Sequence, residues 1–338
     1  MAETAAHTTV TGIETPTTGS LGVSLSRIFA WASVAATFAF LLNNYLTHWL
    51  GFPGIDGALN GTSSALGLVQ IGVVVAAFVI AIGFVQTSQR TLRQDSDALH
   101  NLAAFIIRAA FWGVFLVGIA DTAISFARVE GMLPGLVGDQ MATDLGRSQW
   151  RGPYVHMPLI GLGILIGLFT RSLGFPWLAL LVVVAELIIV ISRFIFSYEQ
   201  AFMGDLVRFW YAALFLFASA YTLFDDGHVR VDVFYAGFTS RTKGWVNAVG
   251  ATILGMALCW TILLLGLWTK SSIINSAMLS YEVTQSGFGM YVKYLMAGFL
   301  GVFATSMMIE FASAFLTGVA DRRGDPGARE KVEESLGH

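Results

Sequence analysis

Eight apolar runs, each close to the length that crosses a lipid bilayer, constrain the fold of this 338-residue chain more than any other feature. A transmembrane helix needs about 20 apolar residues, and a backbone surrounded by lipid must satisfy its own hydrogen bonds. The sequence therefore predicts an all-α polytopic membrane protein with about eight transmembrane helices. The predicted spans are 28–50, 66–86, 102–127, 154–170, 176–198, 206–224, 245–268 and 292–316.

The fourth predicted span, 154–170, is the weakest of the eight because Arg171, Gly174 and Pro176 follow it closely. One interpretation is a short span, a tight turn and a second span. The other is an interfacial helix that leads into a single span. We prefer two spans, which place both ends of the chain on the same side of the membrane.

The basic residues of the loops and tails indicate the orientation. With both termini in the cytoplasm, eleven of these Lys and Arg residues lie on the inner side and five on the outer side. Cytoplasmic loops normally carry the excess of Lys and Arg, so cytoplasmic N and C termini are predicted. The five residues assigned to the outer side are Arg128, Arg147, Arg151, Lys270 and Lys293.

The polar ends of the chain and the order of its spans predict the domain organisation. Residues 1–26 are rich in Thr and Gly and are expected to be a disordered tail, and residues 319–338 are expected to be a charged cytoplasmic tail. We find no convincing internal repeat between the spans. The remaining chain is interpreted as an N-terminal extension of about four spans, 27–172, followed by a four-helix core, 173–318.

Composition and motifs exclude several classes of function. With 12% charged residues and a net charge of −3, the chain has no basic face for nucleic acid. The single Cys259 excludes an intramolecular disulfide and multi-cysteine metal sites. The six histidines are expected in tails, loops or span ends, whereas a membrane haem needs them at mid-depth. No phosphate loop, HExxH motif or nucleophile elbow is present, so we predict neither an enzyme nor a bound cofactor or metal.

Charged residues within predicted spans are candidates for function, because a charge at membrane depth is costly and normally faces protein or water. Glu186 is the deepest, about 16 Å from the inner end of its span. Arg193 follows seven residues later on the same helical face. Glu186 belongs either to a proton or cation relay or to a buried contact that fixes this helix against a partner. We favour the contact.

Two further charge pairs are predicted from depth alone. Arg108 in the third span and Glu310 in the eighth lie at similar depths and are expected to pair. Asp121 in the third span lies at about the height of Arg193 and Arg208, which suggests a second bridge. Both pairs are interpreted as structural links between helices rather than as catalytic groups.

The segment GHVRVD at 227–232 is unusually polar for this chain and is predicted in the cytoplasm, between the sixth and seventh spans. If extended, it places His228, Arg230 and Asp232 on one side. If helical, it brings His228 and Asp232 together at i, i+4. In either case the segment, which begins at Gly227, is suited to tie two helix ends together. Its polar side either contacts a partner subunit or is solvated.

The order of features in the second half of the chain resembles the small membrane subunit of the tripartite ATP-independent periplasmic (TRAP) transporters. Arg193, Phe194 and Phe196 end the first core span, the Gly-His-x-Arg-Val-Asp motif at 227–232 follows the second, and a polar, basic helix start at 239–245 opens the third. The longer first block resembles the N-terminally extended members of that family.

This resemblance implies a three-part system in the bacterial inner membrane. A periplasmic protein binds an organic anion, a large permease carries it in an elevator-like movement coupled to sodium ions, and this chain is a fixed support for the permease among the membrane lipids. The alternatives are a self-sufficient channel or secondary transporter that uses Glu186 as its coupling group, and a membrane anchor for a redox enzyme.

Overall fold

The computed structural model describes residues 20–59, 65–171, 174–198, 201–225, 234–284 and 289–327. Within these ranges the regular structure is entirely helical, and eight helices are long and apolar enough to cross a membrane. The all-α class and the count of eight candidate spans are therefore confirmed. The first half contains α1 (Leu21–His48), α2 (Gly54–Leu59), α3 (Ala65–Thr87), α4 (Leu92–Val129), α5 (Leu133–Val137), α6 (Asp139–Leu145), α7 (Ser148–Arg151), the π-helix η1 (Gly152–His156) and α8 (Met157–Phe169). The second half contains α9 (Phe175–Ile195), α10 (Ala201–Phe224), α11 (Ser240–Gly250), the π-helix η2 (Ala251–Met256), α12 (Ala257–Leu267), α13 (Ile273–Ser280) and α14 (Lys293–Arg323).

Capping residues extend three spans beyond their apolar runs. Helix α1 begins at Leu21, inside the segment expected to be a tail, because the Ser20 side chain accepts a hydrogen bond from the Val23 N–H. Helix α4 begins ten residues before its apolar run at 102, where Thr91 and Gln94 form a capping box. Helix α14 continues to Arg323, past the start of the expected charged tail.

Two of the spans are composite helices that contain a π-helical segment. Helices α7, η1 and α8 form one continuous span, Ser148–Phe169, and α11, η2 and α12 form another, Ser240–Leu267. Pro153 lies at the start of η1 and has no N–H to donate, so a regular α-helical bond cannot form there. Since α9 follows as a separate span, the interpretation with two spans in this region holds.

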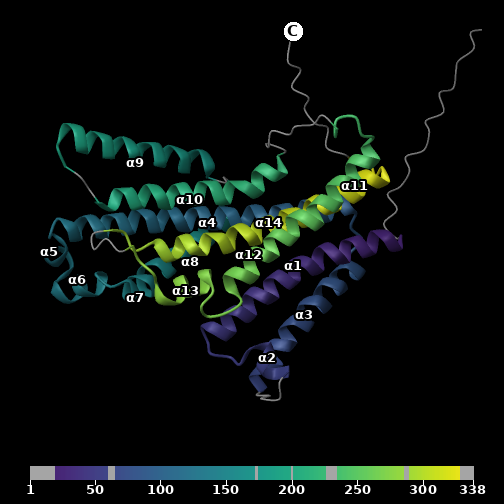
Figure 1. The fold of residues 1–338 in the computed structure, drawn as a ribbon, viewed down its shortest axis with the longest axis horizontal. Helices are drawn as coiled ribbons and strands as arrows, with labels where there is room; N and C mark the ends of the chain where they lie inside the picture. The colour runs from purple at the N-terminus through teal and green to yellow at the C-terminus, as the bar shows by residue number, and fades with distance from the viewer. Residues whose placement is uncertain are drawn as a thin grey trace, which may run out of the picture.

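The eighth span, α14, is the centre of the bundle (Figure 1). It packs against α1, α4, α10, α11, α12 and α13, and 61% of its most apolar window is buried within the chain. Helix α4 lies beside it and also packs on α8 and α10. At the periphery, α9 packs mainly on α10 and α3 mainly on α1 and α2. The first block is therefore joined to the second chiefly through α4.

Small residues allow two pairs of helices to cross at close range. At the α4–α8 crossing, a Cβ added to Gly163 would lie 2.5 Å from the backbone nitrogen of Gly113. At the α11–α14 crossing, a Cβ added to Gly244 would lie 2.6 Å from the carbonyl oxygen of Gly318. In a bilayer, where lipid chains compete with side chains for apolar contact, such close backbone packing is a main source of helix association.

Both described ends of the chain lie at the same end of the bundle (Figure 1), which we call the terminal end. The Arg323 Nη1 donates to Ser20 Oγ at 3.2 Å, joining the end of α14 to the start of α1. Arg93 at the start of α4 forms a 2.8 Å ion pair with Asp321. The opposite end, where α5, α6, α7 and α13 lie, is called the distal end. Because both described ends lie at the same end of the bundle, the chain between them crosses the bundle an even number of times.

Candidate functional site

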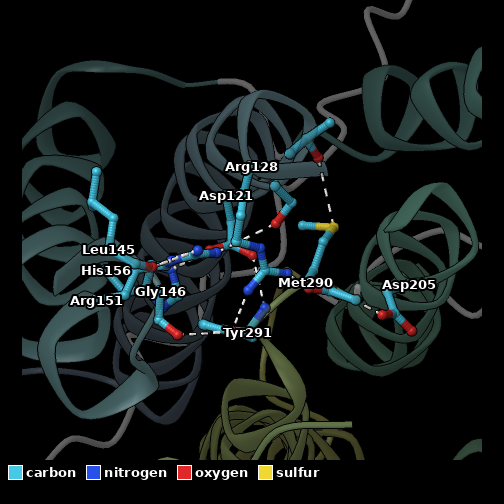
Figure 2. Close-up of polar contacts among 12 residues, drawn as sticks. Asp121, Arg128, Leu145, Gly146, Arg151, His156, Asp205, Met290 and Tyr291 are labelled. Carbon is cyan, nitrogen blue, oxygen red and sulfur yellow. Dashed lines mark hydrogen bonds and ion pairs between the residues drawn. The ribbon is translucent and has the colours of Figure 1, made fainter. Parts of the chain in front are cut away.

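A buried polar cluster occupies the distal end, centred on Asp121 of α4 (Figure 2). One carboxylate oxygen accepts from Arg151 Nη1 at 2.7 Å and lies 3.0 Å from His156 Nε2. The other accepts the backbone N–H of Tyr291 at 2.8 Å. Asp121, Arg151 and His156 are all 0% exposed. Together with Tyr291 and Tyr294, these residues are called the distal cluster.

The guanidinium of Arg151 is fully enclosed by partners. Its Nε and Nη2 donate to the Leu145 carbonyl oxygen at 2.9 and 2.6 Å, and Nη1 also donates to Ser125 Oγ at 3.3 Å. Its carbon Cζ lies 4.2 Å from the centre of the Tyr291 ring. A buried cation is tolerated when its charge is paired and its donors are used, and Arg151 meets both conditions.

The π-helical segment brings His156 into this cluster. Its Nδ1 lies 2.9 Å from the Tyr294 hydroxyl, so both ring nitrogens have partners. Tyr281 packs edge-on against Tyr294 and covers Gly152, where an added Cβ would lie 2.3 Å from the Tyr281 ring. Burial raises the pKa of the Tyr281 hydroxyl, which favours its neutral form.

Further contacts connect the distal cluster to α10. The carboxylate of Asp205 accepts the Met290 N–H at 3.1 Å, directly before Tyr291 (Figure 2). Arg128 of α4 donates to the Gly289 carbonyl at 3.0 Å and to the Tyr291 hydroxyl. The cluster therefore links α4 and the α7–η1 segment to residues 289–291, which lie just before α14. Its chemistry is that of a structural link between the two halves of the chain.

A second ionic network lies at the terminal end. Arg27 of α1 and Asp95 of α4 form a buried ion pair at 2.6 Å, and the same guanidinium donates to the Ser88 hydroxyl at 2.7 Å. This network joins α1, the end of α3 and the start of α4. The two ends of the bundle are thus fastened by different sets of buried charges, with apolar packing between them.

The predicted pairing of Arg108 with Glu310 is wrong. Glu310, 2% exposed, lies 3.0 Å from His100 Nδ1, and His100 stacks on Phe224. Because α4 begins ten residues before its apolar run, His100 is a helical residue that faces α14 rather than a loop residue. Arg108 lies elsewhere on α4, half-buried, and its Nε has no hydrogen-bond partner among the described residues.

The predicted bridge from Asp121 to Arg193 or Arg208 is also wrong. Asp121 pairs with Arg151, while Arg208 faces outward and lies 3.5 Å from Asp205 on its own helix. Arg193 is exposed on α9, which packs mainly on α10 and not on α4. Depth along the membrane is similar for these residues, but α9 packs mainly on α10, and Arg208 lies on the outward face of α10, away from α4.

Glu186 is exposed at the middle of α9, about 16 Å from the start of the helix at Phe175. Its neighbours on the helix surface are apolar and also exposed, among them Val183 at 62% and Leu187 at 54%. Only 11% of the most apolar window of α9 is buried within the chain. Glu186 therefore lies on an outward apolar face and not in the interior of the bundle.

The loop motif at 227–232, with Gly227, His228, Arg230 and Asp232, lies outside the described residues. Its structural role stays a prediction. Sequence reasoning also missed the distal cluster, since Arg151 was assigned to an outer loop and His156 to a span end. One usable signal was the spacing of small residues, Ala109-x₃-Gly113 and Gly163-x₃-Gly167, which indicates that these two helices pack together.

Comparison with known families gives one match. Residues 179–321 match the family model for the DctQ component of the tripartite ATP-independent periplasmic transporters. The matched segment runs from α9 to α14, and α1 to α8 precede it in the chain. No match was found among curated proteins or among solved structures. DctQ is a family of transporter components rather than enzymes, and the second half of this multi-pass membrane protein is similar to it over residues 179–321.

Proposed function

We propose that this protein is a fixed support in the bacterial inner membrane for a large, sodium-coupled permease, which takes up an organic anion delivered by a periplasmic binding protein. Its termini lie in the cytoplasm, as the distribution of Lys and Arg indicates. Residues 173–318 form the small-permease core and residues 27–172 an extension that widens it. The contact surface for the permease is the outward face of α9.

The observation that carries the proposal is the exposure of Glu186. A charged side chain at the centre of a membrane helix costs about 2.5–3.5 kcal/mol on insertion scales when it faces lipid. Nothing within the described residues covers it. A second membrane protein with a basic or hydrogen-bonding side chain at this depth would remove the cost. Arg193, exposed two turns further along α9, suits an acidic or carbonyl partner on the same protein.

The internal fastening of the bundle also supports a static role. Buried ion pairs at both ends and close glycine crossings hold α4, α8, α11 and α14 together. Such contacts favour one arrangement of the helices. A single, fixed arrangement of helices suits a subunit that acts as a support while another subunit moves against it.

Co-expression with the large permease tests the proposal. An affinity tag on this chain is expected to recover the permease, and Glu186→Leu is expected to reduce the recovered amount more than ten-fold, since truncating one partner of a buried charged pair costs about 2–5 kcal/mol. Glu282→Gln is the matched control, because Glu282 is an exposed carboxylate that forms an ion pair with Lys293 away from α9. Equal recovery with wild type and Glu186→Leu would show that this face does not carry the contact.

The self-sufficient transporter remains the rival function, with Glu186 as its coupling group. Liposomes that contain this chain alone distinguish the two. Sodium-driven or proton-driven uptake of an organic anion without a second membrane protein would contradict the proposal. Uptake only after addition of the permease and the binding protein would support it.

A further inference from the structure

Two arginines that have no acidic partner among the described residues lie where the end of α8 packs on α4. Arg108 projects from α4, and Arg171 follows the end of α8. Arg108 directly precedes Ala109, which packs on Gly167, and Arg171 directly follows Thr170, which accepts a hydrogen bond from Trp112, so both arginines lie where the end of α8 meets α4. Neither side chain forms an ion pair or a hydrogen bond with any residue in the described ranges, and Arg108 Nε is a buried donor that is left unsatisfied.

The last residues of α8 and Thr170 are held against α4. Trp112 Nε1 donates to Thr170 Oγ1 at 3.0 Å, and a Cβ added to Gly167 would lie 3.0 Å from the Ala109 Cα. These contacts hold the backbone next to both arginines. The backbone positions of the two arginines are therefore set by the packing of α8 on α4.

The position along the membrane fits a lipid headgroup. Most of the first ten residues of α4 are polar, and Arg108 lies about 9 Å beyond the start of its apolar part at residue 102. An arginine side chain is long enough to extend from this depth toward the headgroups. Trp177, 63% exposed at the start of α9, is a residue type that favours the interface.

The surface beside the two arginines is apolar and open. Leu165, Leu168 and Phe169 on α8 are 56%, 56% and 85% exposed. This surface suits acyl chains, whereas a soluble anion would gain nothing from it. A ligand with a negative phosphate and attached hydrocarbon chains matches both parts of the site.

We propose that Arg108 and Arg171 bind the phosphate of an anionic phospholipid at the terminal end of the bundle. The planar guanidinium groups donate paired hydrogen bonds to phosphate oxygens, and the Nε of Arg108 gains the acceptor that the described residues do not supply. The acyl chains lie along α8. The inference is independent of the proposed function, because it concerns groups within this chain and lipid only.

The test uses the full chain, purified in a neutral detergent. Native mass spectrometry counts bound lipid during titration with phosphatidylglycerol, with phosphatidylcholine, and with inorganic phosphate in separate samples. We expect retention of phosphatidylglycerol, about a ten-fold weaker affinity in Arg171→Gln or Arg108→Gln, and a smaller loss in Arg171→Lys. Arg147→Gln is the matched control, since this exposed arginine lies at the distal end and pairs with Asp144.

Several outcomes would overturn the proposal. They are equal retention of phosphatidylglycerol by wild type and Arg171→Gln, equal retention of phosphatidylcholine, and saturation of the site by inorganic phosphate alone. Arg171 is exposed beyond the end of α8, so its substitution leaves the packing of the turn unchanged. If Arg108→Gln fails to fold, Arg171→Gln and Arg171→Lys still decide the result.

Discussion

Replacement of Asp121 by asparagine is expected to destabilise the fold by removing the one negative charge of the distal cluster. Asp121 and Arg151 are both 0% exposed, and their charged atoms lie 2.7 Å apart. Removing one partner of a buried ion pair costs about 3–5 kcal/mol, because the other charge stays buried and uncompensated. Asparagine keeps an acceptor oxygen for the Tyr291 N–H, so we expect about 3 kcal/mol, or roughly a hundred-fold decrease in the ratio of folded to unfolded protein.

A double-mutant cycle separates the lost charge pair from lost packing. Arg151→Met alone leaves the Asp121 carboxylate buried with His156 and the Tyr291 N–H as its partners. The double variant Asp121→Asn/Arg151→Met has no unpaired charge at this site. Its destabilisation is therefore expected to be smaller than the sum of the two single effects by about 1–3 kcal/mol.

Unfolding in mixed micelles of neutral detergent and sodium dodecyl sulfate, followed by tryptophan fluorescence, gives the free energies. Asp144→Asn is the control, because Asp144 pairs with Arg147 at the surface and such a pair contributes about 0–1 kcal/mol. A change below about 1 kcal/mol for Asp121→Asn, or strictly additive effects in the cycle, would refute the assignment of Asp121 as the buried counter-ion of Arg151.

Two predictions concern the close helix crossings. Gly163→Val is expected to lower the unfolding temperature in detergent, because its Cβ would lie 2.5 Å from the backbone of Gly113. The expected loss of stability is about 1–3 kcal/mol. Gly161→Val is the control: a Cβ at Gly161 meets nothing within 4 Å, so the unfolding temperature should stay nearly unchanged. Gly244→Ala is expected to destabilise the α11–α14 crossing for the same reason, with its Cβ 2.5 Å from the Arg322 nitrogen, whereas Gly250→Ala is expected to be neutral or stabilising because it meets nothing within 4 Å. Equal melting temperatures within either pair of variants would contradict the crossing geometry.

The number of spans could be predicted from the sequence because hydropathy reports directly on contact with lipid or with the protein interior. The ends of the helices could not, since they depend on single side chains such as Ser20 and Thr91 that satisfy the first N–H groups. The start of α4 is the clearest case. Its polar first turns look like a loop, yet Asp95 is a buried partner of Arg27.

The partners of the buried charges were the least predictable part of the candidate site. Depth along a span can be counted from the sequence, but the neighbours of a helix depend on the three-dimensional arrangement of all the helices. Glu310 and Arg108 have similar depths, and Glu310 nevertheless faces His100. The exposure of Glu186 was likewise hidden, because its apolar flanks are equally compatible with a buried and a lipid-facing helix.

The central position of α14 has a consequence for biosynthesis. Proteins are made from the N-terminus, so α1, α4, α10, α11, α12 and α13 are all synthesised before the helix on which they pack. Until Lys293 and the residues after it emerge, Arg27 and Asp95 can already pair, but the α11 glycine has no crossing partner and Glu310 has not been made. The packing of the bundle is therefore completed only when its last span has been made, although seven of the eight candidate spans precede it.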